Sequence, residues 1–132
     1  MRLSPTEADE QKALFELCAF HRHRYPQLDL MFHIPNGGKR DAREAAHFKA
    51  QGVKAGVPDI FLPVPSSGYH GLFIEMKRRD GGKLSEYQKQ WIDALKKQGY
   101  QAIVCFGAEA AMEVILNYLK RSELNENSSR TP

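Results

Sequence analysis

Residues 56–77 read GVPDIFLPVPSSGYHGLFIEMK, which is two apolar runs separated by a Pro-Ser-Ser-Gly turn. Apolar runs on either side of a tight turn predict a β-hairpin. Side chains alternate along a strand, so Glu75 and Lys77 point to the same face. Closure of the hairpin brings Asp59 of the first run beside Glu75. The stretch therefore predicts a patch of two carboxylates and one ammonium group.

Charged groups inside apolar strands are costly unless they pair with each other or with a metal. The carboxylates of Asp59 and Glu75 repel each other when they lie close together. A hard divalent cation with oxygen ligands relieves that repulsion. The patch is therefore a candidate metal site.

The residues of this patch resemble a known nuclease signature. Pro58-Asp59 followed by Glu75-Met76-Lys77 resembles the metal-binding motif of the PD-(D/E)XK superfamily. Further stretches in the same order narrow the resemblance: Glu10-Gln11, His33-Ile34-Pro35-Asn36-Gly37-Gly38, the run from Gly52 to Asp59, and Ser85 with Gln88 and Trp91. Together they resemble the VRR-NUC family, in particular its small standalone members from bacteriophages, over about residues 5–110.

The expected fold is a single α/β domain over residues 1–119, followed by a polar tail at 120–132 that is predicted to be disordered. The resemblance implies a PD-(D/E)XK restriction-endonuclease-like core, with a mixed central sheet flanked by helices. The pattern itself predicts helix, strand, short helix, strand, strand, helix, strand and helix. We expect the first helix to begin at Ser4 and to be followed by a strand at 30–34. A helix is predicted at 41–51, and its packed side is expected to carry Ala42, Ala45, Ala46 and Phe48. A strand is predicted at 101–106, and a last helix from Ala108 to about Leu119.

The resemblance also implies roles for the patch residues. Mg2+ or Mn2+ is expected on Asp59, Glu75 and the backbone carbonyl of Met76. Lys77 would position the attacking water or neutralise developing negative charge. Two further residues are assigned to the site: Glu10 as a support for the metal and Gln88 as a contact to the water or the scissile phosphate. Whether Glu7 or Glu10 supports the metal stays open, as does the number of ions.

Several polar residues are expected to contact DNA. The Gly-rich turn after the 30–34 strand and its two basic residues could be a plain hairpin turn or could cradle a phosphate, and the resemblance favours a DNA-facing loop made of Asn36, Gly37, Gly38, Lys39 and Arg40. Lys54 is assigned to the same surface, and so are Arg78 and Arg79 in a basic loop. Ser85 is both a candidate DNA contact and a good N-cap for the next helix.

The main functional hypothesis is a metal-dependent DNA endonuclease. Small standalone VRR-NUC proteins resemble homodimeric nucleases that cut branched DNA such as Holliday junctions. The alternatives are a flap- or end-directed nuclease, a non-catalytic nucleic-acid-binding module, or an α/β protein in which Asp59, Glu75 and Lys77 form only a structural ion pair. A zinc nuclease of the His-Asn-His kind is rejected, because His21 and His23 fall on different helix faces.

Composition sets broader limits on function. The formal net charge of +3 permits contact with a polyanion without requiring it. No apolar run is long enough to cross a membrane and no signal peptide is evident, so we expect a cytoplasmic protein, in the bacterial host if phage-encoded. Cys18 and Cys105 have no neighbour at zinc-ligand spacing and are predicted to be reduced and buried. No small-molecule cofactor or membrane partner is expected.

Overall fold

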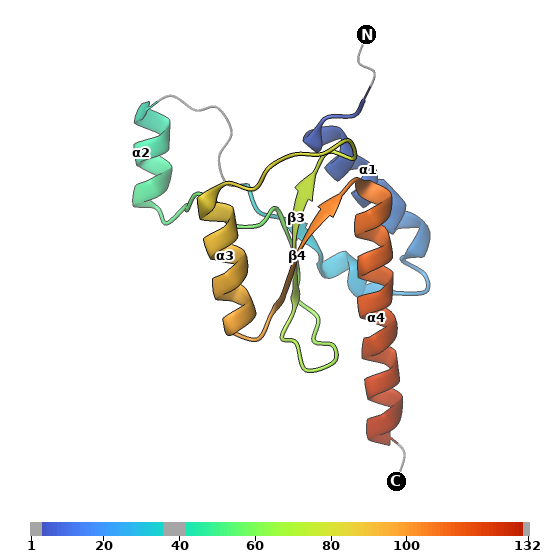
Figure 1. Ribbon diagram of the computed structural model, residues 1–132. Coiled ribbons are helices and arrows are strands. Elements are labelled where there is room, and N and C mark those ends of the chain that lie inside the picture. The colour runs from blue at the N-terminus through green and yellow to red at the C-terminus, as the bar shows by residue number, and fades with distance from the viewer. Residues whose placement is uncertain (1–3, 36–41, 131–132) are drawn as a thin grey trace.

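The chain folds into three layers, with one four-stranded sheet between helices (Figure 1). The computed structural model describes residues 4–35 and 42–130, with side chains described as far as residue 124. Its elements are α1 (Glu7–His21), the short 3-10 helix η1 (Pro26–Leu30), β1 (Phe32–His33), α2 (Ala42–Ala50), β2 (Ile60–Leu62), β3 (Leu72–Lys77), α3 (Glu86–Lys97), β4 (Gln101–Phe106) and α4 (Ala108–Arg130). Helices α1 and α4 cover one face of the sheet and α3 covers the other (Figure 1).

The sheet is mixed, with the order β1-β2-β3-β4. The first three strands pair antiparallel, and β3 pairs parallel with β4 through the α3 crossover. The predicted hairpin is confirmed, with Ile60 opposite Ile74. Its turn places Ser67 and Gly68 at φ values of 51° and 87°, the left-handed pair that a tight hairpin turn requires.

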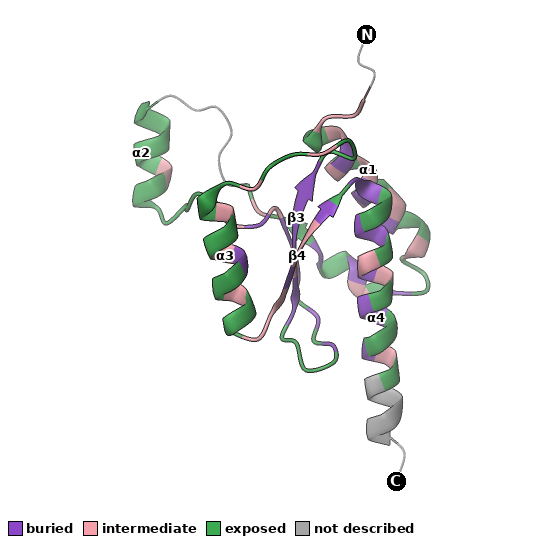
Figure 2. Cartoon of the chain, in the orientation of Figure 1, coloured by how far each residue is buried: buried purple, intermediate pink, exposed green. Residues whose placement is uncertain are grey.

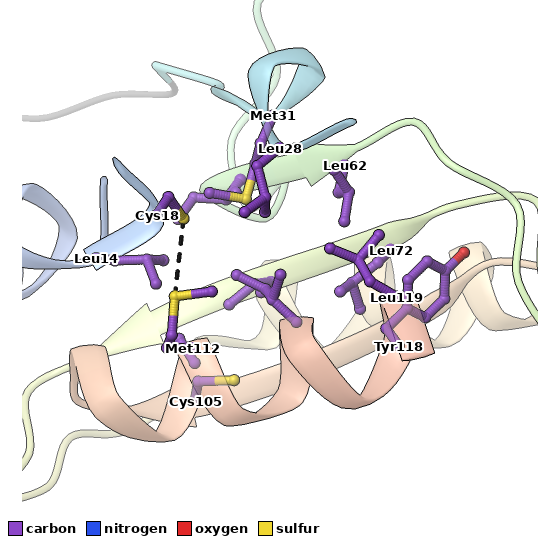
Figure 3. Packing of buried hydrophobic residues seen from close by; sticks show 14 of the residues in the cluster. Leu14, Cys18, Leu28, Met31, Leu62, Leu72, Cys105, Met112, Tyr118 and Leu119 are labelled. Atoms are coloured by element: carbon purple, nitrogen blue, oxygen red, sulfur yellow. Dashed lines mark hydrogen bonds between the residues drawn. The ribbon is translucent and has the colours of Figure 1, made fainter. Parts of the chain in front are cut away.

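The main core lies between the sheet and the α1–α4 pair. Figure 3 shows aliphatic and sulfur-containing side chains from both helices packed on the strands. Cys18 of α1 lies 3.9 Å from the sulfur of Met112 in α4. Cys18 and Cys105 are both buried free thiols, as predicted. This core fixes the position of α1 relative to β3.

The first helix begins later than the sequence analysis predicts. Thr6, not Ser4, is the N-cap, and its side chain accepts a hydrogen bond from the backbone N–H of Asp9. Asp9 completes the capping box by accepting from the backbone N–H of Thr6 at 3.0 Å. Thr6 and Asp9 have the same spacing as Ser4 and Glu7, so the pattern alone did not separate the two frames. The shift leaves the Glu7 side chain free of any capping role.

The predicted strand at 30–34 is also shorter than expected. Only Phe32 and His33 form β1, because Pro26 starts a 3-10 turn that extends through Leu30. The backbone of Ile34 still donates to the carbonyl of Asp59 at 2.6 Å. The predicted turn at Asn36–Arg40 lies outside the described residues.

The predicted packed side of the 41–51 helix is wrong. The helix itself is present as α2, but every residue in it is exposed except Phe48, which is half-buried. Figure 2 shows α2 standing apart from the three layers, almost entirely in the exposed colour. Its alanines favour a helix by intrinsic propensity, but the helix has no buried residue in this chain.

The last helix is longer than predicted. It continues to Arg130 instead of ending near Leu119, so its final turns occupy the tail that the sequence analysis expects to be disordered. Two contacts explain the difference. Ser122 is 7% exposed and donates to the carbonyl of Pro65 at 3.1 Å, and Glu123 forms a two-pronged ion pair with Arg24. Pro65 and Arg24 lie far from these residues in sequence, so the local composition of the tail could not predict the contacts. Across the described chain, we find no helix with the length and apolar character needed to span a bilayer.

Candidate active site

The hairpin brings Asp59 and Glu75 together, as the sequence analysis predicts. Asp59 follows the fully buried Pro58, and one oxygen of its carboxylate accepts a hydrogen bond from the backbone N–H of Met76 at 2.8 Å. That bond holds the Asp59 side chain across the β2–β3 pair, next to Glu75. The chain thus places two carboxylates side by side at one end of a central strand.

Glu75 is almost completely buried, with 2% of its surface exposed. Its Oε2 accepts from the amide of Gln88 at 3.2 Å, whereas its Oε1 is buried without a hydrogen-bond partner among the described residues. Burial, and next the contact with Asp59, raises the pKa of Glu75 well above its ordinary value. A buried carboxylate oxygen without a partner is costly. The site is therefore incomplete as a purely internal ion cluster.

Lys77 lies on the same sheet face as Glu75, with its side chain 7% exposed. Its Nζ donates to Oε1 of Gln88 at 3.2 Å and lies 3.9 Å from Oε2 of Glu75. The third oxygen near Nζ belongs to Glu7 of α1, at 3.7 Å. Lys77 is thus held among oxygen atoms from three different elements, β3, α3 and α1.

Gln88 connects the start of α3 to the strand residues. Ser85 is the N-cap of α3, as predicted, and its hydroxyl accepts from the backbone N–H of Gln88 at 3.1 Å. In return, Oε1 of Gln88 accepts from the backbone N–H of Ser85 at 2.9 Å. The same amide group contacts both Glu75 and Lys77. The capping box therefore fixes the orientation of Gln88 within the patch.

Gly56 packs the segment before Asp59 tightly against α3. It has a φ of 90°, and a Cβ atom at this position would lie 2.6 Å from the backbone carbon of Tyr87. Both the left-handed conformation and the close approach require glycine. The sequence analysis did not connect this glycine to the position of Gln88, the residue next to Tyr87.

Glu10 occupies a different environment from the patch. It is fully buried, and Arg79 binds it through its backbone N–H at 3.0 Å, its Nε at 2.8 Å and its Nη2 at 2.8 Å. The backbone N–H of Ala108 adds a fourth donor at 3.3 Å. The hydrogen bonds from Arg79 lower the pKa of Glu10 to about 2. Both carboxylate oxygens are therefore occupied, and Glu7 is the α1 carboxylate that reaches Lys77.

Among the residues predicted to contact DNA, some are exposed and available, whereas Arg79 is already bound to carboxylates. Lys54 is exposed, and Arg78 is exposed with its Nε 3.6 Å from Asp80. Arg79 is bound to Glu10 and to Glu109. Asn36, Gly37, Gly38, Lys39 and Arg40 lie outside the described residues.

The sequence analysis missed the role of His33. Its Nδ1 lies 2.8 Å from the backbone carbonyl of Asp59, so the edge strand contacts the segment that carries the first carboxylate. The only sequence signal was its place in the stretch 33–38 that carries the resemblance.

The donor set fits a divalent cation with an incomplete protein shell. No group of three or more His, Cys, Asp or Glu side chains within residues 4–35 and 42–130 is arranged to hold a metal. Asp59 and Glu75 supply two carboxylates, and the buried Oε1 of Glu75 has no hydrogen-bond partner among the residues described. Mg2+ is commonly held by one or two carboxylates, with water and substrate phosphate filling its remaining positions.

Comparison with known proteins identifies the family. The model of the VRR-NUC domain matches residues 8–109. The chain belongs to the VRR-NUC family. A solved structure described as "VRR_NUC domain protein" is 32% identical, with a TM-score of 0.74 over 89% of this chain and 90% of the other. No curated protein matches the chain.

This VRR-NUC chain has the nuclease-type fold that the sequence analysis predicts, a mixed four-stranded sheet in a small domain. Family membership implies nuclease activity with DNA as the substrate, in a family that generally uses divalent metal ions. The predicted resemblance and fold class are therefore confirmed.

Proposed function

We propose that this VRR-NUC protein is an endonuclease that hydrolyses phosphodiester bonds in branched DNA, such as Holliday junctions, with Mg2+ or Mn2+ and as a homodimer. The observation that carries the metal-dependent activity is the buried Oε1 of Glu75, which has no hydrogen-bond partner in the part of the chain that the structure describes and lies beside Asp59. A cation would satisfy that oxygen and remove the repulsion between the two carboxylates.

The proposed ligands are the carboxylates of Asp59 and Glu75 and the backbone carbonyl of Met76. Glu7 is the better placed of the two α1 candidates to support the site, because Arg79 and Ala108 occupy Glu10. When bound, the cation supplies Lewis-acid stabilisation of charge on the scissile phosphate.

The protein side chains would orient the reacting groups. Lys77 holds a positive charge among oxygen atoms at the patch, where it can neutralise developing charge or orient the attacking water. Gln88 fixes Lys77 and Glu75 through opposite ends of one amide. Because the Ser85 cap holds Gln88 in place, little reorganisation is needed when substrate binds.

The proposal of a homodimer follows from the need to cut two strands. The described part of each chain has one candidate site, and a twofold dimer presents two sites to a symmetric junction. The exposed helix α2 is the proposed dimer contact, because it carries almost no burial within its own chain. The alternatives are a flap- or end-directed nuclease and a non-catalytic DNA-binding module.

The test is a cleavage panel with labelled four-way junction, 5′ flap, linear duplex and single-stranded DNA, each with Mg2+, Mn2+ or EDTA. Wild type is compared with Lys77→Ala and with Lys89→Ala, a matched control on an exposed α3 lysine that pairs only with Glu86 among the described residues. We expect paired, symmetric cuts in the junction, absent with EDTA and with Lys77→Ala but retained by Lys89→Ala.

Other outcomes have definite meanings. Cutting confined to flaps or free ends supports the flap- or end-directed nuclease. A folded wild type that binds DNA but cuts no substrate with either metal overturns the enzyme proposal and favours the binding module.

A further inference from the structure

The last residue of β4 is a half-exposed phenylalanine beside the candidate active site. The register of the β3–β4 pair places Phe106 directly opposite Lys77, and Figure 1 shows the ends of the two strands side by side. Residues that pair across a sheet point to the same face, so Phe106 lies on the face that carries Glu75 and Lys77. Phe106 is 48% exposed. The patch therefore has an exposed aromatic side chain at its border.

Phe106 is close enough to contact a nucleotide whose phosphate lies at the patch. Neighbouring strands are about 4.8 Å apart, so the backbones of Phe106 and Lys77 are separated by about that distance. Glu75 is the diagonal neighbour of Phe106, because it precedes Lys77 by two residues on β3. Diagonal neighbours lie about 7–8 Å apart, which is within reach of an aromatic side chain. The ring is therefore in position to meet the base next to a phosphate that binds at the patch.

The backbone around Phe106 is held in place along β4 and just after it. β4 pairs with β3 from Gln101 through Phe106. Beyond the strand, the backbone N–H of Gly107 donates to the carbonyl of Lys77 at 3.0 Å, and that of Ala108 donates to the buried carboxylate of Glu10 at 3.3 Å. A phenylalanine on a fixed backbone has only two side-chain torsions to order when it binds a ligand. The position is thus pre-organised for a contact.

The loop after β3 adds positive charge to this end of the sheet. Gly82 lies against the stem of Lys77, since a Cβ atom at Gly82 would be 3.3 Å from Cδ of Lys77. Lys83, the next residue, is exposed. The nearest acidic residue along the chain from Phe106, Glu109, pairs with Arg79 at 3.1 Å. Cations together with an exposed aromatic ring are the combination that binds single-stranded nucleic acid, through phosphate attraction and base stacking.

We propose that Phe106 stacks on the base that flanks the scissile phosphate, and that it selects DNA in which this base is unstacked, as at a branch point. A base inside a duplex is covered on both faces by its neighbours, so it must be unstacked before a side chain can contact its face. A base in a single strand or at a branch point has a face available. The inference rests on the proposed nuclease function for its substrate and adds a specificity-determining residue to it.

The first test measures DNA binding by fluorescence anisotropy at low salt, with the full chain in EDTA. The probes are a labelled oligodeoxythymidine of about 12 nucleotides and the same strand with abasic residues in place of the thymidines. Phe106→Ala is compared with Phe106→Tyr, which keeps the ring, and with Phe20→Ala, a control at a 74% exposed phenylalanine of α1. Melting temperatures of the four proteins are the check on folding.

We expect Phe106→Ala to weaken binding of the thymidine strand about tenfold, the size of one base–aromatic stack. Phe106→Tyr and Phe20→Ala should bind as wild type does. Wild type should bind the abasic strand more weakly than the thymidine strand, and Phe106→Ala should cause no further loss on it. The comparison of the two strands uses wild type alone, so it does not depend on the folding of a variant.

A second test locates the base relative to the cut. Four-way junctions that carry one abasic residue at successive positions are cleaved with Mn2+ in single-turnover reactions, at enzyme concentrations below saturation. Phe106→Ala should cut the unmodified junction about tenfold more slowly than wild type. This difference should disappear only when the abasic residue borders the cut, whereas a purely structural role of Phe106 predicts the same loss at every position.

Four results would overturn the inference. One is a wild type that does not bind the thymidine strand. Another is equal affinity of Phe106→Ala and Phe20→Ala for that strand, and a third is an equal loss for Phe106→Ala on the thymidine and abasic strands. The fourth is a lower oligomeric mass of Phe106→Ala with unchanged DNA affinity, which assigns the ring to a contact with a second copy of the chain.

Failure of this inference is distinguishable from failure of the proposed function. A wild type that binds the strands as expected but cuts no junction contradicts the nuclease proposal and leaves the contact between Phe106 and a base standing. A wild type that cuts junctions, with Phe106→Ala equal to Phe20→Ala in binding and cleavage, contradicts the role of Phe106 and leaves the nuclease proposal standing.

Discussion

Replacing Glu75 with glutamine should stabilise the metal-free protein while it removes metal binding. The buried Oε1 of Glu75 has no hydrogen-bond partner within residues 4–35 and 42–130, and an unsatisfied buried polar group costs about 1–3 kcal/mol. An amide at this position carries no charge to repel Asp59, and its N–H groups can donate to the Asp59 carboxylate. The substitution weakens the 3.9 Å ion pair with Lys77, which keeps its contacts with Gln88 and Glu7.

The net gain for Glu75→Gln should be about 1 kcal/mol, or about 4 °C in melting temperature for a domain of this size. The assay is thermal unfolding of wild type and variant in EDTA, followed by titration with Mn2+. Wild type should gain about 2.7 kcal/mol when the free metal reaches about 100 times its dissociation constant. The variant should gain far less. A Glu75→Gln variant that is less stable than wild type in EDTA, with no metal response in wild type, would refute the metal site and support a structural ion pair.

Three further predictions concern the parts that hold the site in place. Gly56→Ala should lower the free energy of unfolding, measured by chemical denaturation, by at least about 2 kcal/mol, because its Cβ would lie 2.6 Å from Tyr87 atoms at a positive φ. Gly52→Ala should lower it by only about 1 kcal/mol, because Gly52 has a φ of 98° but open space around it, and equal losses would contradict the packing argument. The pKa of Glu10 is lowered to about 2, so its contribution to stability is complete above about pH 4.5 and is lost as the pH falls toward 2. Glu10→Gln should therefore lower the free energy of unfolding by about 3 kcal/mol at pH 7 and show a smaller stability change between pH 4.5 and 2 than wild type. Parallel pH profiles would count against the ion pair of Glu10 with Arg79. Truncation after Leu119 should lower the free energy of unfolding by about 1–2 kcal/mol, because it removes the contacts of Ser122 and Glu123. Truncation after Leu124 keeps these contacts and should have little effect. Identical stabilities of the two truncated proteins would mean that residues 120–124 do not contribute.

The hairpin and its charged patch could be predicted because the determining signals are local. Alternation along the strand fixes the shared face of Glu75 and Lys77, and the turn at Ser67 and Gly68 fixes the register that brings Asp59 alongside. The capping role of Ser85 was equally local, since a cap is decided within one turn.

The remaining features depended on contacts between distant segments. The environment of Glu10 is decided by Arg79 and Ala108, which are 69 and 98 residues away in sequence, so helix periodicity could not distinguish it from Glu7. The tail from residue 120 looked disordered by composition, yet Ser122 has a partner in the hairpin region.

The most direct test of the metal-dependent nuclease site is the single-turnover cleavage rate of a four-way junction with saturating Mn2+, measured for wild type, Lys77→Ala and Lys89→Ala. Melting temperatures of the three proteins serve as the check on folding. We predict that Lys77→Ala is slower by about 100-fold or more, as expected for removal of a group that stabilises charge in the transition state, while Lys89→Ala cuts at the wild-type rate. A folded Lys77→Ala variant that cuts as fast as wild type would contradict the assignment of the active site to the patch of Asp59, Glu75 and Lys77.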